Sequence, residues 1–292
     1  MIIKHSPVIV NTALLAVSLL LAACTSTSVS DDDQAASAKL TSVLDSRSAE
    51  LKARDISRHP KQTIEFFGVT PGMKIAEVLP GGGWYSKILA PYVGSEGAFY
   101  GINYADTMWP MFGFFKPEVI AQRVEAHKAF GDKVATYPGA GNVPSAGYAF
   151  GGIPESLNGT LDAVIMVRAL HNLNRFEAKG GTRTKALKEV NAMLKPGGIV
   201  GVVQHRAPAD ADDEWANGSN GYLKQADVVA MFEQAGFELV GSSEINANPK
   251  DQPVVGDSVW RLPPSLRTSP ENKAVNMAIG ETDRMTLKFV KK

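Results

Sequence analysis

The chain is poor in cysteine: among its 292 residues only Cys24 carries a thiol. A single cysteine excludes an intramolecular disulfide, and it excludes zinc or iron–sulfur sites built from cysteine thiolates. Because Cys24 precedes the segment that we expect to fold, a cysteine nucleophile is excluded from the folded domain as well.

The chain also lacks an excess of charge of either sign. Thirty basic residues balance thirty acidic residues, and 44% of the residues are hydrophobic, an ordinary composition for a globular protein. Without a basic stripe we expect no nucleic acid as a partner, and a small-molecule substrate is favoured. The acidic loop 207–220 has no fixed spacing of metal ligands, so we expect no metal site there.

A long apolar segment, residues 8–23, is short for a membrane span and leads into the sequence LAAC, which ends at Cys24. This pattern resembles the bacterial lipoprotein box, in which the cysteine becomes the lipidated first residue. An ordinary cleaved signal peptide stays the alternative. We predict a lipoprotein signal peptide over 1–23, a polar flexible tether over 24–37 and a folded domain over 38–292.

A lipid on Cys24 would anchor the domain to a membrane of the bacterial cell envelope, facing the periplasm. Thr25 follows the cysteine in place of the aspartate associated with retention at the inner membrane. The outer membrane is therefore favoured.

The stretch 74–86, KIAEVLPGGGWYS, predicts a short buried strand, a turn of three glycines and the start of a helix. Gly81, Gly82 and Gly83 let the backbone turn sharply and leave the N–H groups at the helix start open to a ligand. We expect the helix over 84–93, with Gly94 as its left-handed cap. Such a turn after the first strand of an α/β unit is where nucleotide cofactors sit.

The turn lacks two common cofactor patterns. The dinucleotide fingerprint fails because Ser86 occupies its third glycine position, and no Lys-Ser or Lys-Thr follows at P-loop spacing. What remains is an acidic residue followed by a glycine pair, Glu77-x-x-x-Gly81-x-Gly83.

That pattern resembles the first motif of class I S-adenosylmethionine-dependent methyltransferases, D/E-x-G-x-G-x-G. One departure is Leu79, which stands at the first glycine and is followed by Pro80. PGGGWYSKILAPYVG is also similar to predicted methyltransferases of bacterial envelopes. The resemblance implies that S-adenosylmethionine is the cofactor. It implies cofactor contacts at these positions: Glu77, Pro80, Gly81, Gly82 and Gly83.

Six further strands are predicted after the turn, near 97–106, 133–140, 161–170, 199–207, 237–245 and 283–292, with helices between most of them. This alternation indicates an α/β fold with a doubly wound, mostly parallel sheet. The resemblance implies a Rossmann-like, seven-stranded sheet in the order 3-2-1-4-5-7-6, with an antiparallel C-terminal strand and helices on both faces.

Several positions around the turn keep two interpretations. Asn103 ends the second strand where the family commonly binds ribose hydroxyls with an acidic residue, and Asp106 is the alternative. Arg58 and His59 join two helices predicted before the turn, where they either line the pocket or serve as cap and surface charge. We expect His127, on a helix after the second strand, at the surface.

Polar residues follow the fourth and fifth strands, Arg168 and His171 after one, His205 and Arg206 after the other. Ligands of such sheets bind at the carboxyl ends of the strands. Histidine suits a general base because its ordinary pKa is about 6.5, and arginine suits an anionic or carbonyl group. We expect His171 or His205 as the base and Arg168 and Arg206 as substrate-orienting groups. Tyr222 is a weaker candidate for the pocket wall.

The predicted localisation outside the cytosol is in conflict with the predicted cofactor, because S-adenosylmethionine is made in the cytosol. Three hypotheses therefore stay open. The chain is an active methyltransferase for a small molecule, a non-catalytic lipoprotein that keeps the fold and binds another ligand, or an interaction protein of the envelope whose glycine turn is structural.

Overall fold

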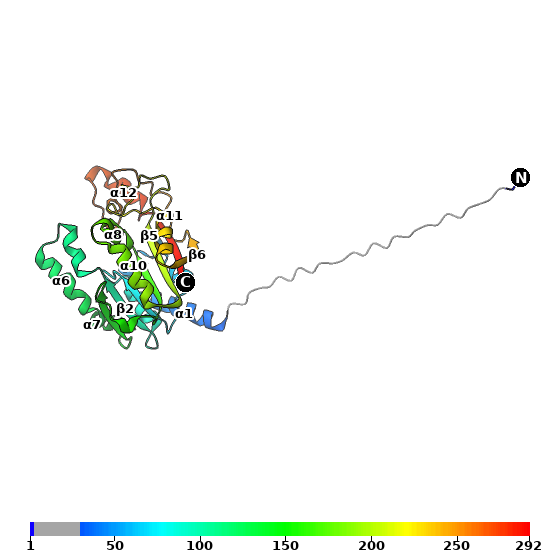
Figure 1. Ribbon diagram of the computed structural model, residues 1–292, viewed down its shortest axis with the longest axis horizontal. Coiled ribbons are helices and arrows are strands. Elements are labelled where there is room, and N and C mark those ends of the chain that lie inside the picture. The colour runs from blue at the N-terminus through cyan, green and yellow to red at the C-terminus, as the bar shows by residue number, and fades with distance from the viewer. Residues whose placement is uncertain (3–29) are drawn as a thin grey trace.

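The computed structural model describes residues 1–2 and 30–292 (Figure 1). Residues 3–23 of the predicted signal peptide, Cys24 and the first part of the predicted tether lie outside the described residues. Among the described residues, no helix combines the length and the apolar character needed to cross a membrane.

The core of the fold is a seven-stranded sheet with the strand order β3-β2-β1-β4-β5-β7-β6, and β7 is antiparallel to both of its neighbours. The predicted order and the antiparallel C-terminal strand are confirmed. The strands are β1 (Lys74–Val78), β2 (Ala98–Asn103), β3 (Ser145–Ala149), β4 (Leu161–Val167), β5 (Leu194–His205), β6 (Phe237–Ser243) and β7 (Arg284–Lys291).

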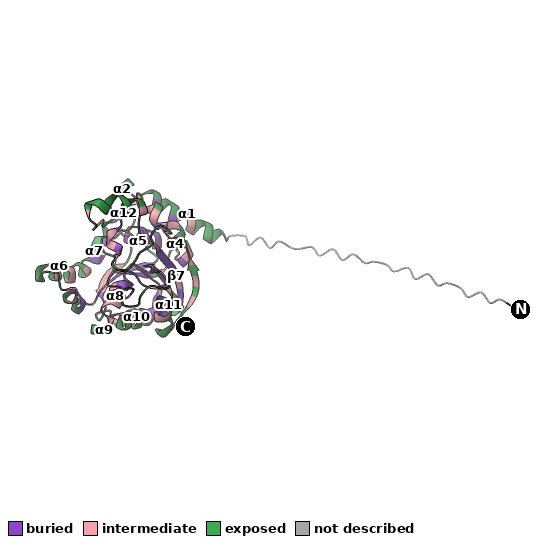
Figure 2. Ribbon diagram, turned by 90° about the horizontal axis from the view of Figure 1, so that it is seen from above, coloured by how far each residue is buried: buried purple, intermediate pink, exposed green. Residues whose placement is uncertain are grey.

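Helices cover both faces of the sheet, and successive residues of β4 supply the two cores: Val164 and Met166 pack on one side, Ala163 and Ile165 on the other. The first face carries η1 (Asp106–Phe112), α8 (Leu170–Arg175), α10 (Thr182–Met193) and α11 (Gln225–Gln234). The second face carries α1 (Asp31–Asp45), α4 (Pro60–Phe67), α5 (Ser86–Val93) and α7 (Phe130–Ala135). Figure 2 shows the buried strands ringed by helices whose outer sides are exposed.

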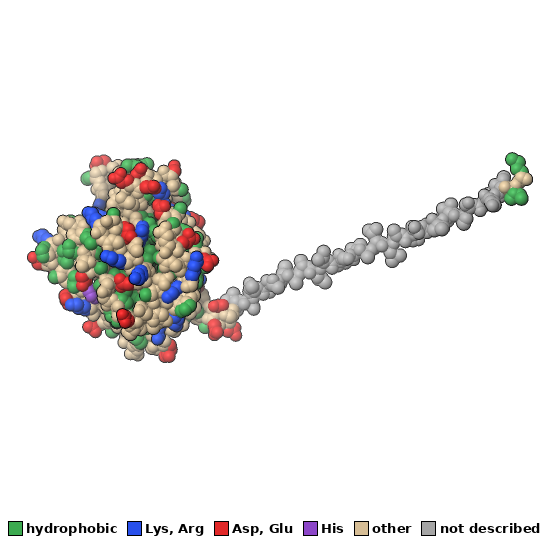
Figure 3. Space-filling model, viewed as in Figure 1, with side chains coloured by type: hydrophobic (Ala, Val, Ile, Leu, Met, Phe, Trp, Pro, Cys, Tyr) green, Lys and Arg blue, Asp and Glu red, His purple; other side chains and the backbone are tan. Residues whose placement is uncertain are grey.

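The remaining elements are short or lie at the ends of the sheet. They are α2 (Ala49–Lys52), α3 (Asp55–Arg58), α6 (Pro117–Lys128), η2 (Glu155–Leu157), α9 (Glu177–Gly180), η3 (Val259–Arg261), η4 (Pro270–Asn272) and α12 (Lys273–Ile279). β1 to β5 end at one edge of the sheet, which we call the carboxyl edge, and β7 begins there because it runs the opposite way. On the face shown in Figure 3, basic and acidic side chains are interspersed.

The third strand lies later in the chain than the sequence predicts. Residues 133–140 begin within α7, and β3 is Ser145–Ala149. Val134 and Tyr137 are buried three residues apart in the same core cluster, a helical spacing. Apart from Tyr148, β3 is built from small residues, and it has none of the β-branched residues typical of strands. A Cβ at Gly147 would lie 1.9 Å from the carbonyl oxygen of His127, so this strand needs glycine where α6 crosses it.

Part of the predicted tether is helical, because α1 begins at Asp31 and includes residues 31–37. The side chain of Ser30 accepts a hydrogen bond from the N–H of Asp33, and three aspartates in the first turn are favourable at the positive end of the helix dipole. Ser37 Oγ also donates to Glu65 Oε1 of α4 at 2.9 Å. The acidic run is thus a helix start packed on the domain.

Two predicted helix boundaries also differ. The helix expected over 38–56 is divided into α1, α2 and α3. The helix after the glycine turn starts at Ser86, and Gly94 at its end has φ 74° and ψ −174°, which is not the left-handed cap that was predicted. Glycine is still required at that position by its positive φ.

Candidate functional site

The glycine turn connects β1 to α5 at the carboxyl edge through three residues with positive φ, Leu79 at 54°, Gly81 at 55° and Gly83 at 79°. A non-glycine residue in this left-handed region is strained by about 1–2 kcal/mol. Leu79 stands where the methyltransferase pattern has its first glycine, and it adopts a backbone conformation that suits glycine. The departure therefore stands at a backbone position that favours glycine, and it carries local strain of the kind that clusters at functional sites.

The glycines of the turn serve different purposes. A Cβ at Gly83 would lie 2.5 Å from the hydroxyl oxygen of Tyr137, so this glycine is required by the fold. A Cβ at Gly82 would meet no atom of the described chain within 4 Å. Gly81 and Gly82 are both exposed. The absence of a side chain at Gly82 thus leaves open space at the start of α5, where a ligand can approach the backbone.

Glu77, near the end of β1, is buried with 4% of its surface exposed. Its carboxylate oxygen Oε2 accepts a hydrogen bond of 2.6 Å from Ser86 Oγ, in the first turn of α5. Burial raises the pKa of Glu77 to about 8, although the Ser86 hydrogen bond acts in the opposite direction. The predicted cofactor residue Glu77 therefore joins the two ends of the glycine turn.

A groove of about 190 Å³ runs from the glycine turn to the end of β2. Its walls include Leu79, Pro80, Gly81 and Asn103, so four positions of the predicted motif region are brought together. The Oδ1 of Asn103 accepts a hydrogen bond of 2.9 Å from the N–H of Tyr104, and the carbonyl has a second lone pair for a ligand.

A larger pocket of about 610 Å³ lies beside this groove, and His127 lines both. His127 is half-buried, with 12% of its side chain exposed, and its Nδ1 lies 3.9 Å from Asp106 Oδ1. The prediction of a surface position for His127 is therefore wrong. α6 turns this histidine inward, because the small residues of β3 allow the helix to lie close against the sheet. The alternative ribose ligand, Asp106, lines the larger pocket rather than the groove.

Arg168, His171 and His205 lie close together at the carboxyl edge. The N–H of Arg168 donates to the carbonyl of Val203 at 2.7 Å, and Arg168 has a φ of 57°, another strained left-handed residue. The rings of His171 and His205 lie 5.7 Å apart between centroids, and both are buried. His205 Nδ1 is 2.6 Å from Thr282 Oγ1. Arg168, His171 and His205 are thus neighbours, as predicted for residues at adjacent strand ends.

Burial keeps both histidines neutral. It lowers the pKa of His171 to about 4, with a partly opposing contribution from Gln204 and a further lowering by the charge of Arg168. Burial also lowers the pKa of His205 well below its usual value, and His171 and Arg168 add to the effect. A neutral imidazole can accept a proton, so either ring is in the protonation state that a general base requires.

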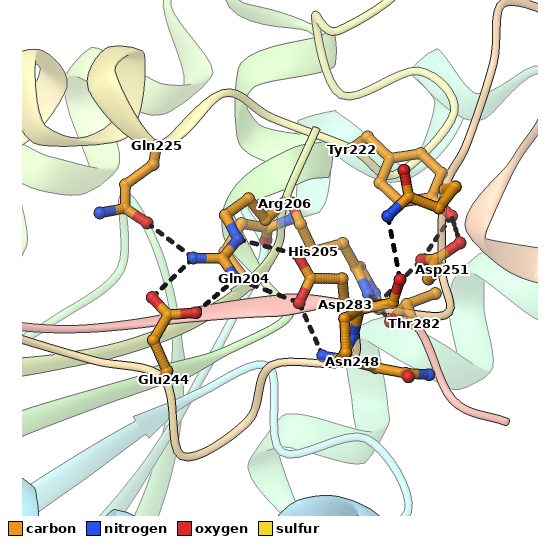
Figure 4. A network of polar contacts seen from close by, with 12 residues as sticks. Gln204, His205, Arg206, Tyr222, Gln225, Glu244, Asn248, Asp251, Thr282 and Asp283 are labelled. Atoms are coloured by element: carbon orange, nitrogen blue, oxygen red, sulfur yellow. Dashed lines mark hydrogen bonds and ion pairs between the residues drawn. The ribbon is translucent and has the colours of Figure 1, made fainter. Parts of the chain in front are cut away.

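Arg206, predicted to orient the substrate, is instead engaged by two carboxylates (Figure 4). Its Nε donates to Asp283 Oδ2 at 2.8 Å, and its Nη2 donates to Glu244 Oε2 at 2.6 Å. These hydrogen bonds raise the pKa of Arg206. The charge of Arg206 is therefore balanced within the protein, in a network that fixes the loops beside β7.

Tyr222 belongs to a neighbouring part of the same network. Its side chain is fully buried and stacks on Trp215 with 5.3 Å between ring centroids. Its hydroxyl donates to Asp251 Oδ2 at 3.0 Å (Figure 4). Burial, with the charge of Asp251 as the next cause, raises the pKa of Tyr222. Tyr222 thus supports the wall formed by residues after β5.

The structure adds three site residues that sequence reasoning did not single out, Arg54, Arg284 and Glu281. Arg54 Nη2 donates to Glu281 Oε1 at 2.6 Å, and Arg284 Nη1 donates to Glu281 Oε2 at 3.0 Å. Arg58, left open between pocket and surface, is also here: it is 2% exposed and its Nε lies 3.5 Å from Glu281 Oε2. The residues from α3 are more than 200 positions from Glu281 in the chain, so no local motif indicates this cluster.

Trp84, which follows the glycine turn directly, connects the turn to this cluster. The guanidinium carbon of Arg58 lies 4.5 Å from its ring centroid, and that of Arg47 lies 5.3 Å away. Trp84 Nε1 also donates to the carbonyl of Leu51 at 3.1 Å. Within residues 30–292 the side chains form no group of three or more histidines or carboxylates that would hold a metal ion.

Comparison with known proteins gives similarities at the level of structure. No family model matches the chain, and no curated protein matches it. A SAM-dependent methyltransferase from Aquifex aeolicus is 19% identical, with a TM-score of 0.47, over 72% of this chain and 93% of that protein. The [4+2]-cyclase SpnF is 14% identical, with a TM-score of 0.47, over 80% of each chain. An arsenic(III) S-adenosylmethionine methyltransferase from Chlamydomonas reinhardtii is 14% identical, with a TM-score of 0.45, over 87% of this chain and 73% of that one.

Proposed function

We propose that this chain transfers the methyl group of S-adenosylmethionine to a small-molecule acceptor. The observation that carries the proposal is the glycine turn: Leu79 keeps the left-handed backbone of the missing glycine, and Gly82 leaves open space at the start of α5. Pro80, Gly81, Gly82 and Asn103 would hold the cofactor along the groove at the carboxyl edge. The protonated Glu77 would keep the turn in place through Ser86.

The cofactor supplies a methyl group that is already electrophilic because it is bound to a sulfonium. With the cofactor bound, a hydroxyl or amine of the acceptor would form the new bond to the methyl carbon as the carbon–sulfur bond breaks, and the electron pair of that bond would stay on sulfur. His171 would take the proton that the acceptor loses, because its ring is neutral and follows the end of β4 at the carboxyl edge, although the charge of Arg168 opposes its protonation. The acceptor atom must also be held in line with the methyl group. Catalysis therefore depends mainly on how the protein binds and orients the two reactants.

Calorimetric titration of the full chain with S-adenosylmethionine and S-adenosylhomocysteine tests the proposal. We expect micromolar binding that Gly82→Val abolishes with little change in thermal midpoint, since that side chain would fill open space. Gly141→Val is the matched control, an exposed glycine without positive φ. Wild-type protein that is folded and does not bind millimolar cofactor would overturn the proposal.

One observation favours the second hypothesis, a non-catalytic protein that binds a different ligand. The groove at the turn measures about 190 Å³, below the roughly 300–1,000 Å³ usual for pockets that enclose a drug-sized ligand. Binding of a smaller ligand in the groove, together with no response to S-adenosylmethionine, would favour this function. Binding of the whole cofactor would require the larger pocket that shares His127.

We further propose that the chain is a lipoprotein of the bacterial envelope, attached through lipid on Cys24 and facing the periplasm. The support is the apolar segment 8–23 followed by LAAC. Mass spectrometry of the protein from its host would show a diacylglyceryl group on Cys24. Cys24→Ala should release the domain from the membrane fraction. An unmodified cysteine in the mature chain would contradict this localisation. It would also remove the conflict between a periplasmic protein and a cofactor made in the cytosol.

A further inference from the structure

Four arginines come together at the carboxyl edge, and we call Arg54, Arg58, Arg168 and Arg284 the arginine cluster. Arg54 and Arg58 come from α3 and its N-terminal side, Arg168 follows β4, and Arg284 begins β7. Three of them contact the same carboxylate, Glu281. Arg168 joins them through the sheet: it bonds to Val203, two residues before His205, and His205 is paired with Arg284.

Glu281 contacts three of the four guanidinium groups, and the setting is largely buried. Arg58 is 2% exposed, Arg284 3% and Glu281 9%. Asp55, the carboxylate of α3, is ion-paired with Arg47, so it does not balance the arginine cluster. The two histidines are neutral and add no negative charge. Burial of unbalanced charge is costly, and a site of this kind is stabilised when an anion enters it.

The cluster also has hydrogen-bond donors without a partner. Arg58 Nη2 and Arg168 Nε are buried and have no hydrogen-bond partner among the described residues. Arginine presents such donors in a planar fork that matches the oxygens of a carboxylate or phosphate. Burial lowers the pKa of Arg58 to about 9 and that of Arg168 to about 10, and repulsion from neighbouring arginines acts in the same direction. Both groups remain charged at neutral pH.

The cluster lies next to the proposed methyl-transfer site. Arg58 stacks on Trp84, the residue after Gly83, and Arg168 stands three residues before His171. A group bound by Arg58 and Arg168 is therefore close to both the glycine turn and the proposed base.

We propose that the methyl acceptor is an oxyanion, a small molecule with a carboxylate or phosphate group that binds Arg58 and Arg168 beside Glu281. This inference rests on the proposed function and names the substrate class of the same site. The bound anion would also partly cancel the charge of Arg168 next to His171, so that the imidazole becomes a stronger base when the acceptor is in place.

The test uses calorimetry of the full chain with two simple probes, inorganic phosphate and succinate, in a buffer of low chloride. We expect at least one probe to bind with a Kd below about 10 mM, and the stronger of the two identifies the preferred oxyanion. Arg58→Gln and Arg168→Gln should each weaken binding about tenfold or more, since each removes charged hydrogen bonds to the anion. Arg168→Lys keeps the charge without the fork and should give an intermediate loss.

Arg183→Gln is the matched control, because Arg183 is a half-buried arginine that pairs with its own carboxylate, Glu177, and not with Glu281. It should leave anion binding unchanged. A wild-type Kd above about 10 mM for both probes, or equal affinity in wild type and the folded Arg58 and Arg168 variants, would overturn the inference. If the Gln variants do not fold, the anion affinity of Arg168→Lys is compared with that of the wild type, and equal affinity would overturn the inference.

Titration of the same samples with S-adenosylmethionine separates this inference from the proposed function. Cofactor binding without anion binding would remove the oxyanion acceptor and leave methyl transfer in place. Anion binding without cofactor binding would overturn methyl transfer. The Arg58 and Arg168 variants should bind the cofactor as the wild type does.

Discussion

Ser86 donates a 2.6 Å hydrogen bond to Glu77, and this contact joins the end of β1 to the first turn of α5. The carboxyl group has a pKa of about 8 in the folded protein, raised by burial from an ordinary value of 4.5. The folded state therefore holds a proton on Glu77 that the unfolded chain releases between these two values.

Glu77→Gln should change how stability depends on pH. Because the folded pKa is raised, Glu77 loses stabilising free energy as pH increases from about 4.5 to about 8, at up to about 1.4 kcal/mol per pH unit. Glutamine can accept the same Ser86 hydrogen bond and does not titrate. In urea unfolding, the stability difference between variant and wild type should move in favour of the variant from pH 5 to pH 9. A constant difference would show that the carboxyl titrates normally.

Gly83→Ala should destabilise the fold, whereas Gly82→Ala should not. Alanine at position 83 takes a left-handed φ and places its Cβ 2.5 Å from the Tyr137 hydroxyl, which together cost about 2–3 kcal/mol. Tyr137→Phe in the same chain should recover part of that loss, which a double-mutant cycle in urea measures. Equal costs for the two glycines would contradict the open space assigned to Gly82.

His171 should remain neutral across the physiological range. Its lowered pKa of about 4 means that stability declines as pH falls from about 6.5 toward 4, because the unfolded chain takes up the proton first. The imidazole C–H resonances of His171, assigned by their loss in His171→Gln, should move little between about pH 8 and pH 5.5. A titration midpoint near 6.5 would be incompatible with the buried, unprotonated base.

Arg168→Gln should stabilise the protein in the absence of anions. Removing this half-buried guanidinium relieves both its desolvation and its repulsion by Arg284, and we expect a gain of about 1 kcal/mol in low salt. Differential scanning fluorimetry in a dilute zwitterionic buffer checks this by comparing the thermal midpoints of Arg168→Gln and the wild type. Added phosphate should reverse the order of these two midpoints. Loss of stability equal to that of the control Arg183→Gln would indicate that Arg168 is balanced within the fold.

Arg206→Gln should act on stability alone. It leaves the half-buried Asp283 without its main cation, at a cost of about 1–3 kcal/mol in urea unfolding. Affinity for phosphate and for S-adenosylmethionine should stay at the wild-type values. A selective loss of either affinity would restore Arg206 to the substrate site where the sequence places it.

The sequence predicts the sheet well because the signals are local. The apolar run of β4 and the glycines at 81–83 each identify their element without reference to distant residues. β3 escapes prediction because its small residues are selected by contact with α6, which sequence periodicity does not reveal. The same limit applies to the site: His171 and Arg168 follow from strand ends, whereas the partners of Glu281 are set by tertiary packing alone.

The contact between Arg54 and Glu281 spans 227 positions of the chain. During synthesis the guanidinium groups of α3 leave the ribosome long before the carboxylate that partly neutralises them, and the strand that carries Arg284 comes last of all. Until then the edge of the nascent sheet carries positive charge without its acidic counterpart. The arginine cluster is therefore completed only when β7 is made, and a translation product that stops before β7 lacks Arg284.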